Sequence, residues 1–277
     1  MPPTDTRTAT TARPTRGFAF DLDGTVYLGD ALLPGALELI GALAERGVPY
    51  VFATNNSSVP GSVYVERLTR LGLPAGREHV VTSNDAAVQH LRSAGLARPY
   101  LLAPPAVHAE YAEQGIEHEI EEPDCVLLAF DTTLDYEKIR TAAHLIRAGV
   151  PYLATHPDPV CPTPRGGEPD VGSFMAMFET ATGLRPTVLG KPHGGMARLV
   201  TERLGLPADG VAFVGDRLET DIRMARDHGF LGVLTLTGVT SREQLASSDL
   251  SPDLVVDGLV ELLAHLPAAP ARAGAAG

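Results

Sequence analysis

The stretch from Gly17 to Tyr27 restricts the fold of this chain more than any other. It begins with an apolar run, Phe18 to Phe20, which is typical of a buried strand. Two carboxylates, Asp21 and Asp23, follow at the end of that strand. Because ligands of open α/β sheets bind beyond the carboxyl ends of the strands, the pair predicts a functional site there. Two acids so close repel each other unless a cation or a proton relieves the repulsion.

Runs typical of strands alternate with runs of helical spacing through most of the chain. The alternation predicts an α/β protein with a Rossmann-like core of three layers, in which helices cover both faces of a parallel sheet. The pattern restarts after residue 81, which predicts a large inserted α/β unit. We therefore expect a core at 17–81 and 185–266, an inserted unit at 82–184, and disordered tails at 1–16 and 267–277.

The composition limits which binding partners and which cellular compartment we expect for this protein. A net charge of −12 disfavours a nucleic-acid partner, which would need a basic surface. We find no run of about 18 apolar residues, so we expect no membrane span, and residues 1–16 lack the apolar segment of a secretory signal. The two cysteines, Cys125 and Cys161, do not suggest a disulfide scaffold, and so we expect a cytoplasmic protein.

Four polar clusters follow predicted strands, and a parallel sheet would bring them to one edge. The clusters are Asp21 with Asp23, Thr54 with Asn55 and Asn56, Lys191, and Asp216 with Asp221. Asp21 and Asp216 offer the hard oxygen ligands that Mg²⁺ prefers, while Thr54 and Lys191 can hold phosphate oxygens. A carboxylate can attack phosphorus, and a second carboxyl can move the proton of the leaving oxygen.

Each cluster also has an ordinary explanation, because Asp, Thr and Asn cap helices and fill turns. Lys191 is harder to explain in this way, since only Lys138 and Lys191 are lysines among the 22 basic residues. A compact ammonium therefore has a use there that a planar guanidinium does not serve. All four clusters together favour a phosphoryl-transfer centre over four unrelated turns.

The chain resembles the haloacid-dehalogenase (HAD) superfamily of Mg²⁺-dependent phosphohydrolases at four motifs: Asp21–Thr25, Thr54, Lys191 and Gly215–Asp221. It is similar to the NagD-like, p-nitrophenylphosphatase-like branch (subclass IIA) at 52–58, 190–192, 215–221 and 234–239. The resemblance extends over nearly all of the chain from Gly17 to Leu266. It implies that the unit at 82–184 is a cap domain beside a catalytic core.

The resemblance also implies a role for each matching residue. Asp21 would be the nucleophile and a Mg²⁺ ligand, and Asp23 would be the general acid/base, with its backbone carbonyl on the metal. Asp216 would be the remaining carboxylate ligand, and Asp221 would support these ligands or bind the metal through water. The phosphoryl group would be held by Thr54, Asn55, Asn56 and Lys191.

The stretch 156–172 is dense in Pro and Gly, and we expect it to be a loop without strands. It resembles the place where the branch positions its substrate-contacting loop. Cys161 lies near the position where some relatives that act on aromatic cofactors carry a His, and Arg165 and Glu168 are candidates for contact with a polar, sugar-like leaving group. A solvated loop without a ligand is the alternative for all three.

These observations predict a Mg²⁺-dependent phosphomonoesterase that acts on a small phosphorylated metabolite, such as a sugar or polyol phosphate, through an aspartyl phosphate. Two alternatives stay open at this point. One is a phosphotransferase or mutase on the same centre, and the other is a non-catalytic binding or regulatory protein with the same fold. A homodimer formed through the cap is a further expectation.

Overall fold

A six-stranded parallel sheet forms the larger half of the molecule in this computed structural model, which describes residues 15–163 and 165–267. The strand order is β14-β13-β12-β1-β4-β5. The bounds are Gly17–Phe20 (β1), Tyr50–Thr54 (β4), Val80–Thr82 (β5), Val211–Gly215 (β12), Leu231–Thr235 (β13) and Leu254–Val256 (β14). The predicted parallel α/β fold is confirmed.

Helices cover both faces of this sheet. Phe18 and Phe20 of β1 point to one face, where they pack in a cluster with α1 (Ala36–Arg46), α2 (Gly61–Arg70) and the 3₁₀ helix Leu259–His265. Ala19 points to the other face, which α7 (Gly194–Leu204) and α8 (Arg223–His228) cover. Burial on both sides explains why the strand is apolar at successive positions rather than at alternate ones.

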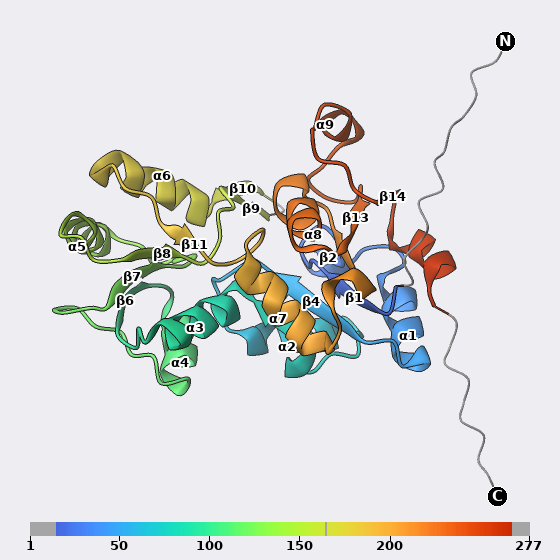
Figure 1. Ribbon diagram of the computed structural model, residues 1–277, viewed down its shortest axis with the longest axis horizontal. Coiled ribbons are helices and arrows are strands. Elements are labelled where there is room, and N and C mark those ends of the chain that lie inside the picture. The colour runs from blue at the N-terminus through green and yellow to red at the C-terminus, as the bar shows by residue number, and fades with distance from the viewer. Residues whose placement is uncertain (1–14, 164, 268–277) are drawn as a thin grey trace, which may run out of the picture.

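A second parallel sheet has the order β11-β8-β7-β6, and Figure 1 shows it beside the first along the long axis of the molecule. Its strands are Pro99–Leu102 (β6), Cys125–Leu128 (β7), Tyr152–Ala154 (β8) and Thr187–Val188 (β11). One face packs on α3 (Ser83–Ala94) and α4 (Pro105–Glu113), and the other on α5 (Tyr136–Arg147) and α6 (Val171–Thr182). The chain leaves the first sheet after β5 and returns to it at β12.

Strand β11 corrects one predicted boundary. We expected residues from 185 onward in the catalytic unit, but Thr187 and Val188 pair with β8 in the second sheet. Leu189, just beyond, packs in the apolar cluster of that sheet. A strand of two residues carries no pattern that assigns it to a sheet. The other predicted domain boundaries stay predictions.

The stretch expected as a bare loop is a β-hairpin. Strands β9 (Val160–Thr163) and β10 (Gly166–Pro169) pair antiparallel, and Figure 1 shows them between the two halves of the molecule. Prolines are tolerated here because each strand has an unpaired edge. The remaining short elements are β2 (Tyr27–Leu28), β3 (Ala31–Leu32), α9 (Arg242–Ala246), the 3₁₀ turns Arg77–His79 and Ala208–Gly210, and the π-helical turn Leu218–Ile222.

The predicted tails at 1–16 and 267–277 lie mostly outside the described residues. Their inner ends belong to the fold, which corrects those boundaries. The Arg16 amide donates to the carbonyl of Gly210 at 2.7 Å, and the Pro267 carbonyl accepts from the Arg46 side chain at 3.2 Å. None of the helices that the structure describes has the length and apolar character needed to cross a bilayer.

Candidate active site

The carboxyl ends of β1, β4 and β12 meet at one edge of the first sheet. These strands are neighbours, so Asp21, Thr54 and Asp216 emerge side by side. A cavity of about 30 Å³ lies over this edge, between the two halves of the molecule. It is lined by Asp21, Asp23, Thr54, Asn55, Asn56, Asp158, Cys161, Pro162, Asp170, Lys191, Arg217 and Thr220.

Lys191 is the electrostatic centre of the site. Its Nζ donates to Asp21 Oδ1 at 2.5 Å, to Asp221 Oδ1 at 2.8 Å and to the carbonyl of Ala53 at 3.0 Å. Only 2% of the side chain is exposed. Burial alone would lower the pKa of Lys191, but the carboxylates of Asp21 and Asp221 outweigh it and raise the pKa above its ordinary value. The lysine is therefore charged, and all three of its donors are used.

Three buried acids converge beside this lysine. Asp21, Asp216 and Asp221 each offer a carboxylate oxygen, and these oxygens lie within 4.8 Å of one another. Asp216 Oδ1 is buried without a hydrogen-bond partner, while Oδ2 accepts from the Val239 amide at 2.6 Å. Burial, with the charges of Asp21 and Asp221, raises the pKa of Asp216. An orphaned oxygen among converging carboxylates fits a divalent cation, which would satisfy the oxygen and relieve the repulsion.

Asp221 is already engaged on both sides. Its Oδ1 accepts from Lys191 at 2.8 Å and its Oδ2 accepts from the Arg217 amide at 3.1 Å. Because these contacts use both oxygens, a supporting role or binding through water suits it better than direct ligation. Asp216, with its free oxygen, suits direct ligation.

Asp23 stands opposite, close to the basic side chain of Arg67. The Tyr27 hydroxyl donates to Asp23 Oδ2 at 3.4 Å. Burial, and next the charge of Asp21, raises the pKa of Asp23 to about 6, against the opposing charge of Arg67. Such a carboxyl can both give and take a proton near neutral pH. Gly24 follows at φ +89°, and a Cβ there would meet Asp216 Oδ2 at 2.6 Å, so a side chain would displace the acid.

The loop after β4 carries the predicted phosphoryl-binding residues. Thr54 Oγ1 accepts from the Asn56 amide at 3.1 Å. The side chain of Asn55 holds the Lys191 backbone instead of pointing freely into the cavity: Oδ1 accepts from the Lys191 amide at 2.8 Å and Nδ2 donates to the Lys191 carbonyl at 3.1 Å. Asn55 therefore fixes the lysine in place, which sequence reasoning did not anticipate.

The hairpin contributes one of the three predicted cap residues and leaves two outside. Cys161 lines the cavity, and its Sγ accepts from Asn56 Nδ2 at 3.8 Å. Arg165 and Glu168 instead pair with each other at 3.3 Å in solvent, with side chains 89% and 48% exposed. Neither lines the cavity, so their predicted contact with a leaving group has no support in this arrangement.

Sequence reasoning missed four residues on the wall of the cavity or behind it. Asp158 accepts from Asn55 Nδ2 at 3.3 Å and lies 3.8 Å from the guanidinium of Arg217. Asp170 lines the same wall, and His156 is fully buried between the two acids. Arg217 lies inside the 215–221 motif, and the two acids flank the hairpin. The sequence therefore shows these charged residues, but it does not predict that they come into contact.

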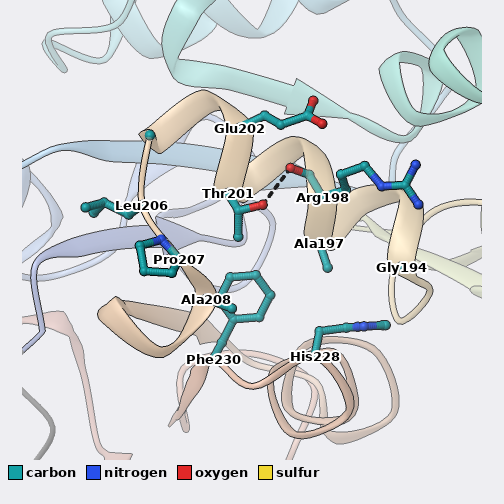
Figure 2. Close-up of a pocket in the computed structure, with 11 residues that line it drawn as sticks. Gly194, Ala197, Arg198, Thr201, Glu202, Leu206, Pro207, Ala208, His228 and Phe230 are labelled. Atoms are coloured by element: carbon teal, nitrogen blue, oxygen red, sulfur yellow. Dashed lines mark hydrogen bonds between the residues drawn. The ribbon is translucent and has the colours of Figure 1, made fainter.

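A second hollow offers no comparable chemistry. It holds about 560 Å³ along the outer side of α7, next to His228 and Phe230, and Figure 2 shows its lining. Glu202 is its single acid, and Thr201 Oγ1 is committed to the carbonyl of Arg198 at 2.8 Å. Neither a pair of carboxylates nor a buried cation lines it, so the strand-end cavity is the better candidate for the active site.

Comparison with known proteins gives the family. Residues 18–117 match the model of the haloacid dehalogenase-like hydrolases, and residues 188–262 match a HAD-hydrolase-like model. The chain is 32% identical to 5'-nucleotidase YutF of Bacillus subtilis, over 91% of this chain and 98% of that protein. It is 31% identical to an acid sugar phosphatase of Staphylococcus aureus, over 91% of this chain and 98% of the relative.

Solved structures of similar fold support the same family assignment. A 4-nitrophenylphosphatase from Thermotoga maritima superposes with a TM-score of 0.86 at 40% identity, covering 90% of this chain and 96% of that one. A glycerol phosphate phosphatase from Mycobacterium tuberculosis, in complex with calcium, gives 0.82 at 32% identity, covering 89% of this chain and 74% of that one. The chain therefore belongs to the haloacid dehalogenase-like hydrolases, as the resemblance predicted, and is a phosphatase of their NagD and p-nitrophenylphosphatase group.

Proposed function

We propose that this protein is a Mg²⁺-dependent phosphomonoesterase that hydrolyses a small phosphorylated metabolite through an aspartyl phosphate on Asp21. One observation carries the proposal: Lys191 is held between Asp21 and Asp221 at the strand ends, beside the unsatisfied carboxylate oxygen of Asp216. A charged ammonium and a cluster of acids suited to a cation together form a site for a phosphoryl group.

The metal site would use oxygen ligands from two strand ends. Asp216 Oδ1, a carboxylate oxygen of Asp21 and the backbone carbonyl of Asp23 would hold the ion, with Asp221 behind them. An all-oxygen set with few carboxylates suits Mg²⁺, which keeps several waters. When bound, the ion supplies positive charge to the phosphoryl oxygens and to the attacking carboxylate.

The chain's own residues would carry the reaction in two steps. A carboxylate oxygen of Asp21 attacks phosphorus, the bond from phosphorus to the leaving oxygen breaks, and Asp23 gives that oxygen its proton. Asp23 then takes a proton from water, whose oxygen attacks the phosphorus, so that inorganic phosphate leaves and the Asp21 carboxylate is restored. Thr54, Asn55, Asn56 and Lys191 would hold the phosphoryl oxygens throughout. Lys191 would act through its charge, since its three donors are engaged by Asp21, Ala53 and Asp221, and the Asn55 side chain would act through Lys191.

The named relatives support a small phosphomonoester as the substrate. Their names state a nucleotide, sugar phosphate, nitrophenyl phosphate or glycerol phosphate substrate. The common part of these molecules is the phosphoryl group, which the strand-end residues would bind. We propose a sugar or polyol phosphate, because the wall of the cavity opposite the phosphoryl site is polar: it carries Asp158 and Asp170, and Arg217 from the strand-end side lies 3.8 Å from Asp158.

The decisive experiment measures phosphate release from p-nitrophenyl phosphate. We expect turnover with Mg²⁺, none after chelation, and recovery when Mg²⁺ is restored. Asp21→Asn should abolish turnover, because an amide cannot form the covalent intermediate. Asp30→Asn removes a charge from an acid whose side chain is 88% exposed near the same stretch, and should leave turnover unchanged. Near-normal phosphate release by Asp21→Asn would refute the covalent mechanism.

Two further expectations remain proposals. The free thiols of Cys125 and Cys161 suit a reducing compartment, so we infer a cytoplasmic protein. Exposed apolar side chains of the second sheet's unit, among them Ile120, Tyr136 and Leu184, could contribute to a homodimer through the cap. Sedimentation of the wild type and of Tyr136→Ser would test the dimer.

A further inference from the structure

The cavity has two walls of different character. The strand-end wall carries Lys191 and the predicted phosphoryl-binding loop, while the wall from the second half of the molecule carries Asp158, Asp170 and Cys161. A phosphomonoester bound to the first wall would point its alcohol part at the second. The second wall therefore decides which alcohols are accepted, provided that the proposed function holds.

The acids of this second wall are unequally compensated. Asp158 lies 3.8 Å from Arg217 and accepts from Asn55, so its charge is balanced. Asp170 has no Lys or Arg within ion-pair distance among the described residues, and its nearest basic neighbour is His156 at 3.5 Å. Its Oδ1 caps α6 by accepting from the Val171 amide at 2.7 Å. No hydrogen bond between described residues reaches its Oδ2, so that oxygen is left for a ligand.

His156 is a second indication that this wall lacks hydrogen-bond donors. The ring is fully buried, 3.7 Å from Asp158 and 3.5 Å from Asp170, yet neither nitrogen makes a hydrogen bond. Buried polar atoms are nearly always satisfied in native proteins. A neutral imidazole has a single N–H, so it can serve only one of the two carboxylates. The wall is therefore short of donors.

We propose that Asp170, supported by His156, selects phosphomonoesters whose leaving alcohol carries hydrogen-bond donors and no negative charge. A hydroxyl of the alcohol would donate to Asp170 Oδ2 and supply the missing donor. A carboxylate or second phosphate at the same place would face the Asp170 carboxylate, which has no Lys or Arg partner among the described residues. A like charge at such a distance costs about tenfold in affinity or more. Polyol phosphates fit this wall, and phosphorylated acids of the same size do not.

The test compares two substrates that differ only in this feature. Glycerol 3-phosphate and 3-phosphoglycerate have the same chain length, but one ends in a hydroxymethyl group and the other in a carboxylate. At about pH 8.5, where the Asp170 carboxyl is ionised although burial raises its pKa to about 7, we expect the wild type to prefer glycerol 3-phosphate by about tenfold or more in kcat/KM. Asp170→Asn keeps the shape and the helix cap while it removes the charge, so kcat/KM for 3-phosphoglycerate should rise about fivefold. The value for glycerol 3-phosphate should stay within about threefold.

Glu168→Gln is the matched control. It removes a negative charge two positions away, from a side chain that is exposed and outside the cavity, so the substrate ratio should not change. Equal rates on the two substrates in the wild type, or equal shifts in both variants, would overturn the inference. Hydrolysis of p-nitrophenyl phosphate by the same preparations separates this failure from a broader one. If the enzyme hydrolyses p-nitrophenyl phosphate but does not distinguish glycerol 3-phosphate from 3-phosphoglycerate, only this inference fails. If it does not hydrolyse p-nitrophenyl phosphate with Mg²⁺, the proposed function and the inference both fail.

Discussion

Lys191 is expected to contribute both to the stability of the fold and to the proposed reaction. Its ammonium is buried against Asp21 and Asp221, so each partner would be left as an uncompensated charge without it. Breaking a buried ion pair from one side costs about 3–5 kcal/mol. Lys191→Met keeps the length of the side chain and removes the charge. We expect a lower free energy of unfolding and a fall of about 100-fold or more in kcat/KM for p-nitrophenyl phosphate.

Lys138 provides the control, because it is the chain's other lysine and also holds a buried acid. Its Nζ lies 2.8 Å from Asp131 Oδ2, at the end of β7 in the second sheet. Lys138→Met should also lower the free energy of unfolding, but kcat/KM should stay within about twofold, since no substrate contact is lost. If Lys191→Met kept wild-type kcat/KM, the ammonium would be a structural feature alone.

The pair formed by His156 and Asp170 makes a prediction about stability and pH. Burial lowers the pKa of His156 to about 4, with Asp158 opposing and Arg217 and Lys191 adding to the decrease, and burial raises the pKa of Asp170 to about 7. Between about pH 4 and 6.5 the folded pair holds one proton, and the unfolded chain also holds one, on the histidine. The two shifts therefore cancel, and the pair adds almost no pH dependence to wild-type stability.

Asp170→Asn should remove that cancellation. The folded variant keeps His156 neutral, while the unfolded variant still takes up a proton below pH 6.5. Stability must then fall as the pH falls from about 6.5 toward 4, because the unfolded state binds more protons. Urea unfolding at pH 7 and pH 5 should show an extra loss of about 1–2 kcal/mol in the variant relative to the wild type. A parallel pH profile for the two proteins would contradict this account.

At the scale of elements, the turn after β13 sets the position of Asp216. Gly238 lies so close that a Cβ would come within 1.9 Å of Asp216 Oδ2, and the next amide, of Val239, donates to that oxygen at 2.6 Å. Gly238→Ala should push the carboxylate away from the metal site. We expect the Mg²⁺ concentration for half-maximal activity to rise about tenfold, because residues that orient metal ligands commonly have effects of this size.

Gly41→Ala is the contrasting change. Gly41 lies inside α1, and a Cβ there would have no neighbour within 4 Å. The substitution should raise the free energy of unfolding by about 0.5–1 kcal/mol, since alanine loses less backbone entropy in a helix. Its Mg²⁺ titration should match that of the wild type. Equal metal affinity in both glycine variants would show that the turn does not position Asp216.

The elements also show what the sequence could and could not predict. The sequence could predict that Asp21 and Asp216 lie close together. Each follows an apolar run that forms a parallel strand, and the residues that follow parallel strands lie at a common edge of the sheet. Asp158 and Arg217 could not, since their contact depends on how the second sheet packs against the first. The hairpin of β9 and β10 was missed because short strands rich in Pro and Gly lack an alternating pattern. That hairpin turns Arg165 and Glu168 to solvent, which charge alone could not indicate.

At the scale of the whole molecule, the two halves close over the cavity through polar contacts. Ser57 Oγ accepts from the Phe130 amide at 2.8 Å and lies 2.9 Å from Thr155 Oγ1, and Asn55 reaches Asp158. The cavity left between the halves holds about 30 Å³, which is room for about two water molecules. A phosphomonoester is larger than this, so we expect the halves to part to admit it and to release the products.

The two cysteines can report this motion. Cys161 lines the cavity, whereas Cys125 lies fully buried in β7 within the second half. Burial raises the pKa of both thiols to about 12, so neither reacts rapidly in the closed arrangement. Cys161 is half-buried, so we expect a disulfide reagent such as dithiobis-nitrobenzoate to label this one thiol of the native enzyme slowly, and faster when the halves part. Mg²⁺ with inorganic phosphate should slow the labelling by favouring the closed arrangement.

Two controls assign the signal to the opening of the cavity. Cys161→Ser should remove the reaction of the native protein and leave a thiol, Cys125, that reacts only on unfolding. Labelling of Cys161 as fast as a free thiol, with or without phosphate, would mean that the halves rest apart. No labelling during turnover would mean that substrate reaches Lys191 by another route. If the halves part, labelling should be slow and should be suppressed by phosphate with Mg²⁺, because the movement that admits the substrate also increases the exposure of the half-buried thiol.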